Sequence, residues 1–276
     1  MTTTTQPVSL LFAEVLLTWH VTNYLLSADP NRAERSSWTS RATAKRVSWF
    51  LIRAVGAGVL TLAIGGLWPG VLLAGVMFFG CLMLPLARLM WVPTRYLAEL
   101  ELVANLLIVA VAEWLIAHFN LQARWALFHI PVRENLISIY TIAAALLIFV
   151  VRGGTYIVRG VLDRAGTMPP PEAEHPFNLP SPTKIGVQAA LPVDTIELNH
   201  GRLIGNVERL ILVLFVANGQ YTALAFFFAA KGIIRSKDVE SRAWADYLIL
   251  GSLTSFLVAV VVGLVIQATL HSAASQ

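Results

Sequence analysis

The residues best placed to do chemistry together are a glutamate and a lysine on either side of an Asn-Gly turn. Glu208 lies eleven positions before Gly219, and Lys231 lies twelve positions after it. If two antiparallel helices meet at that turn, the two charges lie at the same depth. An isolated charge in a bilayer costs several kcal/mol, and an oppositely charged neighbour is the usual compensation. We therefore expect an ion pair between Glu208 and Lys231.

Three further charged residues fall in the same layer of the last helices: Arg209, Arg235 and Asp246. The sequence thus predicts a buried ionic cluster of five residues that connects the last three helices. Such a cluster could relay protons or ions. The alternative is a polar contact that fixes the helix register while the end charges reach the interface. The register interpretation is favoured, because buried ion pairs often serve specificity rather than chemistry.

Polar residues inside other apolar runs are candidate ligand positions. They are Glu14, His20 and Asn23 in the first run, and Glu113 and His118 near the end of another. Glu14 and His20 are six positions apart, which places them on different faces of a helix and disfavours a shared metal ion. A tetrapyrrole on a membrane histidine is the one cofactor considered. A hydrogen-bonded structural histidine is favoured, so no cofactor is required and no metal site is predicted.

Motifs that mark an enzyme are missing from the sequence. It has no Gly-rich phosphate loop, no His-Glu-x-x-His zinc site and no Gly-x-Ser-x-Gly nucleophile elbow. Its single cysteine, Cys81, rules out a disulfide within the chain. Lys and Arg are spread among the polar segments, so nucleic-acid binding has no support. These absences favour a protein without catalytic residues.

Composition places these residues in a bilayer. Hydrophobic residues make up 57% of the 276 positions, charged residues only 13%, and the mean hydropathy is +0.68. Soluble domains carry about 25% charged residues. A helix needs about 20 apolar residues to cross a bilayer core. The runs of that length are 8–27, 47–68, 70–92, 97–118, 136–159 and 243–270.

Two shorter apolar stretches, 203–217 and 221–234, are separated only by Asn218-Gly219-Gln220. Asn-Gly is a strong turn signal, so we expect a tight helical hairpin whose two short helices either cross the bilayer or re-enter it. The predicted fold is therefore an all-α polytopic membrane bundle of about eight helices. The lipid bilayer is its first expected partner.

Small residues recur at four-residue spacing along the last apolar run: Gly251, Ser255, Ala259 and Gly263. Such a row lets a second helix approach closely, which replaces the hydrophobic driving force that is missing in lipid. We expect this helix-packing ridge to bind another helix. The spacing leaves open whether that helix belongs to the same chain.

Prolines predict where the chain divides, and basic residues predict its orientation in the membrane. Residues 163–200 contain Pro169-Pro170-Pro171 and four further prolines, which favours an extended linker between a five-helix part (1–162) and a three-helix part (201–276). Basic residues concentrate in 28–46, in the connection that carries Arg88 and Arg95, and in 152–202. Basic loops stay in the cytoplasm, so the linker is expected inside and both termini outside.

The carboxyl-terminal stretch resembles a known family. The segments Gly201-Arg202-Leu203-Ile204-Gly205 to Glu208-Arg209, then Ala230-Lys231-Gly232-Ile233-Ile234-Arg235, and Ala245-Asp246-Tyr247 carry the likeness over 201–256. They are similar to a bacterial membrane family described as domain of unknown function 3307. That family typically opens with His-x-x-x-Asp-Phe, where this chain has Trp19, Asn23 and Tyr24. The resemblance implies a bacterial inner-membrane protein whose first helix has lost an ionisable pair.

Three functions remain in view from the sequence. The first is a non-catalytic accessory or scaffold subunit of a larger energy-transducing complex, with other membrane chains as partners. It follows from the missing motifs, the lost ionisable pair and the packing ridge. The second is a small-solute or ion transporter that uses the Glu208–Lys231 layer, although transporters usually show internal repeats. The third is an intramembrane enzyme, supported only by scattered histidines and glutamates.

Overall fold

The computed structural model describes residues 9–26, 40–66, 68, 70–121, 134–167, 195–235 and 242–274, and almost all of these are helical. Five helices in this part of the chain are long and apolar enough to cross a membrane. They cover Lys45–Gly65, Gly70–Trp91, Thr94–His118, Leu136–Arg164 and Ala245–Ser272. Helices leave no backbone polar group exposed to lipid, which is why apolar runs of this length adopt them. The predicted all-α membrane bundle is confirmed.

Several of the helices contain a short π-helical turn. In chain order the first five elements are α1 (Leu10–His20), the π turn η1 (Val21–Leu25), α3 (Ser40–Gly65), α4 (Gly70–Leu86) and the π turn η2 (Ala87–Trp91). A 3-10 turn η3 (Thr94–Tyr96) leads into α5 (Leu97–His118). Then come α6 (Glu134–Ile148), the π turn η4 (Phe149–Gly153), α7 (Gly154–Arg164), α8 (Thr195–Ala217), α9 (Tyr221–Arg235) and α10 (Arg242–Ala274).

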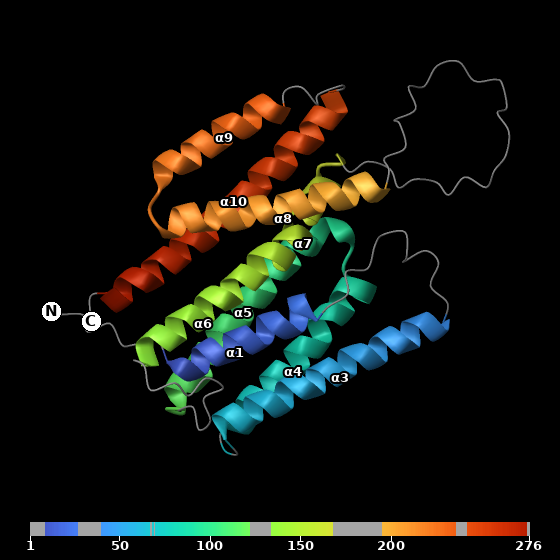
Figure 1. The fold of residues 1–276 in the computed structure, drawn as a ribbon. Coiled ribbons are helices and arrows are strands. Elements are labelled where there is room, and N and C mark those ends of the chain that lie inside the picture. Colours follow the sequence, from blue (N-terminus) through green and yellow to red (C-terminus); the bar gives the residue numbers. More distant parts are fainter. Residues whose placement is uncertain are drawn as a thin grey trace.

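The helices form three groups along the bundle. Figure 1 shows the α3–α4 hairpin at one end, helices α8 to α10 at the other, and α1 with α5 to α7 between them. Buried side chains of α1, α3, α4 and α5 form one apolar core, and those of η4, α7, α8 and α10 join a second core with Tyr24 and Leu97. The buried polar residues discussed below lie in and beside these two cores.

Helix α1 lies inside the bundle rather than against lipid. Ser9 begins it by accepting a hydrogen bond from the Phe12 backbone amide at 3.1 Å, as an N-cap does. With η1, the helix covers Leu10 to Leu25, which is shorter than the span expected over 8–27. Most of its residues are buried, including Glu14 and Trp19. Because protein surrounds α1, it can carry more polar side chains than a lipid-facing helix.

The predicted hairpin after the linker is present, but its first helix is longer than expected. Gly219 takes the left-handed conformation with φ of +68°, which suits an Asn-Gly turn. Helix α8 has 23 residues and α9 has 15. The expected bounds 203–217 followed the apolar residues, whereas the helix continues back through the polar residues to Thr195. Apolar patterning marks lipid or core contact, and it does not mark where a helix must begin.

The ridge on α10 packs within the chain. Ala259 is completely buried and Ser255 nearly so. A Cβ atom at Gly263 would lie 2.6 Å from Val216 Cβ on α8, and one at Gly251 would lie 3.6 Å from Leu162 Cδ1 on α7. The small residues therefore let α10 approach α8 and α7 closely. The spacing alone left open whether the partner helix belongs to the same chain. In the structure the ridge packs against α8 and α7 of the same chain.

Candidate functional site

Three π turns bring polar and aromatic residues to the centre of the bundle. Tyr24 comes from η1, Arg88 from η2 and Phe149 from η4. The rings of Tyr24 and Phe149 lie 5.6 Å apart, edge to face. A π turn holds one extra residue and often marks a functional site, because it redirects side chains that a regular helix would place elsewhere. The three turns together make this region the candidate site.

Local sequence explains η2 and the ring positions at η4. Pro85 lies inside α4, two residues before η2, where it removes a backbone donor and crowds the preceding turn. In η4, a Cβ atom at Gly153 would lie 2.4 Å from Phe149 Cδ2 and 3.1 Å from Tyr24 Cε1. Glycine is therefore needed at 153 for these two rings to occupy their places.

A doubly hydrogen-bonded ion pair forms the core of the site. Arg88 Nε donates to Glu101 Oε1 at 2.6 Å, and Arg88 Nη2 donates to Glu101 Oε2 at 2.8 Å. Their side chains are 4% and 0% exposed. Arg88 Nη1 donates to the Asn23 carbonyl oxygen at 3.1 Å, and the guanidinium lies 4.3 Å from the centre of the Tyr156 ring. Two parallel bonds of this kind are the strongest arginine–carboxylate arrangement.

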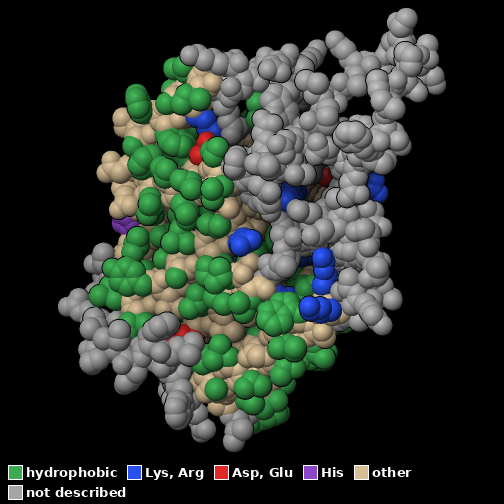
Figure 2. All heavy atoms as spheres, turned by 45° about the vertical axis from the view of Figure 1, so that its right-hand side comes forward, with side chains coloured by type: hydrophobic (Ala, Val, Ile, Leu, Met, Phe, Trp, Pro, Cys, Tyr) green, Lys and Arg blue, Asp and Glu red, His purple; other side chains and the backbone are tan. Residues whose placement is uncertain are grey.

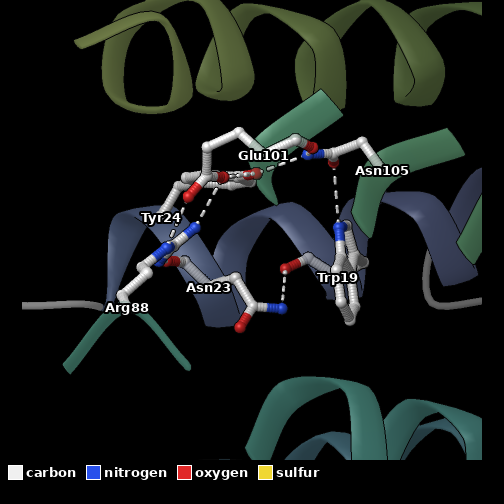
Figure 3. A network of polar contacts seen from close by, with 6 residues as sticks. All are labelled: Trp19, Asn23, Tyr24, Arg88, Glu101 and Asn105. Carbon is white, nitrogen blue, oxygen red and sulfur yellow. Dashed lines mark hydrogen bonds and ion pairs between the residues drawn. The ribbon is translucent and has the colours of Figure 1, made fainter. Parts of the chain in front are cut away.

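The ion pair extends into a chain of hydrogen bonds through α1, η1 and α5. Tyr24 Oη donates to Glu101 Oε2 at 2.7 Å, and Asn105 Nδ2 donates to Tyr24 Oη at 2.6 Å. Trp19 Nε1 donates to Asn105 Oδ1 at 3.0 Å. Figure 3 shows these side chains meeting across the helices, with Glu101 facing Arg88 and Tyr24. We call Trp19, Tyr24, Arg88, Glu101 and Asn105 the central network.

The central network is suited to fixing helix positions. Both carboxylate oxygens of Glu101 receive hydrogen bonds from Arg88, and the charge is compensated within the pair. In a low-dielectric interior such bonds are strong only while every member keeps its partner. A shift of α5 relative to α4 and η2 would leave a buried charge unpaired, which costs several kcal/mol. A shift of α1 would break the hydrogen bonds of Trp19 and Tyr24. The network therefore sets the relative register of three helices at one depth.

Sequence reasoning missed this network. Arg88 was expected with Arg95 in a cytoplasmic connection, but it is buried because η2 turns its side chain towards Glu101. A signal was available: Arg88 lies five positions before Pro93 and Glu101 lies eight after it. Opposite charges on both sides of one turn predict a pair, as they do for Glu208 and Lys231. Pro85 indicates an irregular turn before Arg88, but it does not predict that a π turn changes the face of the helix that Arg88 occupies.

The polar positions predicted in α1 and η1 are buried beside the network. His20 Nδ1 lies 2.8 Å from the Leu16 carbonyl oxygen, and the His20 ring stacks on Tyr24 at 5.6 Å. These contacts agree with a hydrogen-bonded structural histidine. Asn23 donates to the Trp19 carbonyl oxygen at 3.2 Å, and Glu14 is completely buried.

The two candidate positions on α5 lie elsewhere. Glu113 and His118 are exposed near its carboxyl end, where His118 stacks on Trp114 at 5.0 Å between ring centres. The structure does not bring them to the central network. Among the described residues, no group of three or more His, Cys, Asp or Glu side chains could hold a metal ion.

The predicted pair between Glu208 and Lys231 is present, and it joins α8 to α9. The two side chains are 16% and 14% exposed, so the pair lies near the surface rather than in the core. Arg209, expected in the same cluster, donates to Thr155 Oγ1 at 2.9 Å and so reaches towards α7. Asp246 is exposed on α10. The side chain of Arg235 lies outside the described residues.

Reversing the charges of the pair tests its role. We expect Glu208→Lys alone to weaken the attachment of α9 by about 1–3 kcal/mol, between the values for exposed and buried pairs. The double change Glu208→Lys with Lys231→Glu should recover most of that loss. The measurement is the melting temperature in detergent, combined with protease sensitivity of the 218–220 turn. A double variant no more stable than Glu208→Lys would show that the two residues do not stabilise one another.

Fold and site together define a class: a multi-pass, all-α membrane protein with a buried ionic network among its central helices. No known protein family, curated protein or solved structure matches this chain. The resemblance to domain of unknown function 3307 stays a prediction. The residues aligned with that family's His-x-x-x-Asp-Phe segment are Trp19, Asn23 and Tyr24, and all three lie in or beside the central network.

Proposed function

We propose that this protein is a non-catalytic accessory or scaffold subunit of a larger bacterial inner-membrane complex, such as an energy-transducing one. The observation that carries the proposal is the closed character of the central network. Arg88 and Glu101 are bound to each other, and Tyr24 and Asn105 complete the hydrogen bonding. A catalytic or transport site needs groups that exchange partners with a substrate, whereas these groups hold helices in place.

Helix α9 supports a role in assembly. It contacts the bundle through the Glu208–Lys231 pair, through Tyr221, which donates to Gln267 Oε1 at 2.9 Å, and through Phe228 against Phe256. Elsewhere it leaves large apolar side chains outside the fold, including Phe226, which is 77% exposed. In Figure 1 this helix lies at the edge of the bundle. Such a helix offers an apolar face to a membrane helix of another chain.

Much of the remaining surface suits lipid. Figure 2 shows hydrophobic side chains covering most of the described part of one face, with few charges between them. Exposed residues such as Leu106 on α5 and Leu257 on α10 would contact acyl chains.

For orientation we propose that both termini lie outside and the linker 163–200 inside, since basic residues flank the expected cytoplasmic ends.

Co-purification from native membranes tests the proposal. We expect gentle extraction of the full chain, followed by mass analysis, to yield one or more membrane proteins in fixed ratio to it. The double variant Phe226→Ser with Ile233→Ser changes only exposed side chains of α9. It should retain less of the partner than the parent protein does. A chain that runs alone in both forms would remove the subunit proposal.

The second candidate is an ion or small-solute transporter, and the Glu208–Lys231 pair favours it. The pair lies partly exposed between α8 and a 15-residue helix, and short helices with charges line many transport sites. A transporter reconstituted in vesicles should lose flux when Glu208 is changed to Gln, while its fold survives. The subunit proposal instead expects no flux from either form.

A further inference from the structure

Arg53, in the α3 span, is a second buried arginine beside the central network. Its side chain is 5% exposed, and its Nη1 donates to the Thr22 carbonyl oxygen in η1 at 3.0 Å. A buried guanidinium costs several kcal/mol unless a negative group compensates its charge. Arg88 has Glu101 for that purpose. In the part of the chain that the structure describes, no ion pair joins Arg53 to a carboxylate.

Comparison of the two arginines shows where the missing partner belongs. Each uses Nη1 to bind a carbonyl oxygen of η1: Arg53 that of Thr22, and Arg88 that of Asn23. Arg88 then presents its Nε and Nη2 atoms to both oxygens of a carboxylate. The same two atoms of Arg53, Nε and Nη2, are buried and have no hydrogen-bond partner in the described chain.

Nε and Nη2 form the flat edge of a guanidinium that binds two oxygens of one anion in parallel. We propose that this edge of Arg53 binds a phosphate group. The surroundings leave a place for a negative ligand, because Glu101, the carboxylate nearest to Arg88, is already bound to Arg88 through both of its oxygens and does not pair with Arg53.

The position of Arg53 in the membrane favours the phosphate of a lipid. It lies eight positions into the span Lys45–Gly65, about 12 Å from its beginning at 1.5 Å per residue. Next to it on α3, Trp49, Ile52 and Val55 are exposed and would contact acyl chains. A phospholipid could therefore place its headgroup at Arg53 and its tails along α3.

The test uses the full chain purified in a neutral detergent and three probes. Phosphatidylglycerol carries both phosphate and acyl chains, diacylglycerol carries the chains alone, and inorganic phosphate carries the anion alone. We expect phosphatidylglycerol to raise the melting temperature and to remain bound in native mass spectra, while diacylglycerol does neither. A response to inorganic phosphate without one to phosphatidylglycerol would support the site with a free anion as its ligand.

Variants connect the response to Arg53. Arg53→Gln should weaken phosphatidylglycerol binding about tenfold or more, the effect of losing hydrogen bonds to a charged group. Arg95→Gln removes the same charge from an exposed arginine and should bind like the parent protein. If Arg53→Gln does not fold, Arg53→Lys keeps the charge, removes the two-atom edge and should also bind more weakly. Equal binding by the parent and a folded Arg53 variant, or no binding of either phosphate probe by the parent, would overturn the proposal.

Discussion

Changing Glu101 to glutamine is expected to destabilise the folded bundle by about 3–5 kcal/mol, the cost of leaving one member of a buried ion pair without its partner. Glutamine keeps the size of the side chain, so packing changes little. It removes the negative charge that compensates Arg88 and one of the two acceptor oxygens that Arg88 uses. The measurement is the melting temperature of the purified protein in detergent, together with the fraction that elutes as a single folded species.

Two further variants separate charge from packing. Tyr24→Phe removes only the hydroxyl that donates to Glu101 and should cost about 1 kcal/mol. The double change Arg88→Met with Glu101→Leu removes both charges and should be more stable than Glu101→Gln, because apolar replacement of a buried pair is often neutral. If Glu101→Gln melts at the same temperature as the parent protein, the central network does not hold the helices.

Changing Gly263 to alanine is expected to destabilise the contact of α10 with α8 by about 1–3 kcal/mol, the usual cost of overpacking a core. The added Cβ atom would lie 2.6 Å from Val216 Cβ and 3.3 Å from the Val213 carbonyl oxygen. Both atoms are fixed by the backbone of α8, so the helices must separate to make room. The measurement is again the melting temperature, together with the elution profile from fluorescence-detected gel filtration.

Gly251→Ala supplies the matched control on the same ridge. There the new Cβ atom would lie 3.6 Å from Leu162 Cδ1, an ordinary contact with the end of a flexible side chain. Alanine also favours helix over glycine by about 1 kcal/mol, so this variant should be as stable as the parent or slightly more so. Equal effects of the two changes would mean that the close approach of α10 to α8 does not limit stability.

The two predictions concern different parts of one scaffold. The central network holds α1, α4 and α5, whereas the ridge joins α10 to α8 and α7. Arg209 bonds α8 to η4 and α7, since its Nη2 lies 3.3 Å from the Val151 carbonyl oxygen and 2.9 Å from Thr155 Oγ1. These contacts connect the two parts of the chain on either side of the linker. A rigid scaffold of this kind agrees with the proposed role as a subunit.

The sequence by itself determined the membrane class and the helical fold. Long apolar runs can satisfy their backbone groups in lipid only as helices or closed barrels, and these runs have helical length. It also determined the Glu208–Lys231 pair, because the Asn218-Gly219 turn lies midway between the two residues and fixes their depth locally. In both cases the outcome depends on residues close together in the chain.

Only the tertiary structure decided which faces of the helices meet. Each π turn adds a residue to its helix and so rotates the following side chains by about 100° relative to a regular helix, which periodicity cannot anticipate. That is why Arg88 and Tyr24 meet Glu101 inside the bundle. The burial of α1 and the closure of the α10 ridge against α8 likewise depend on packing between distant segments. Such packing in lipid is set by shape complementarity, which no single segment of the sequence contains.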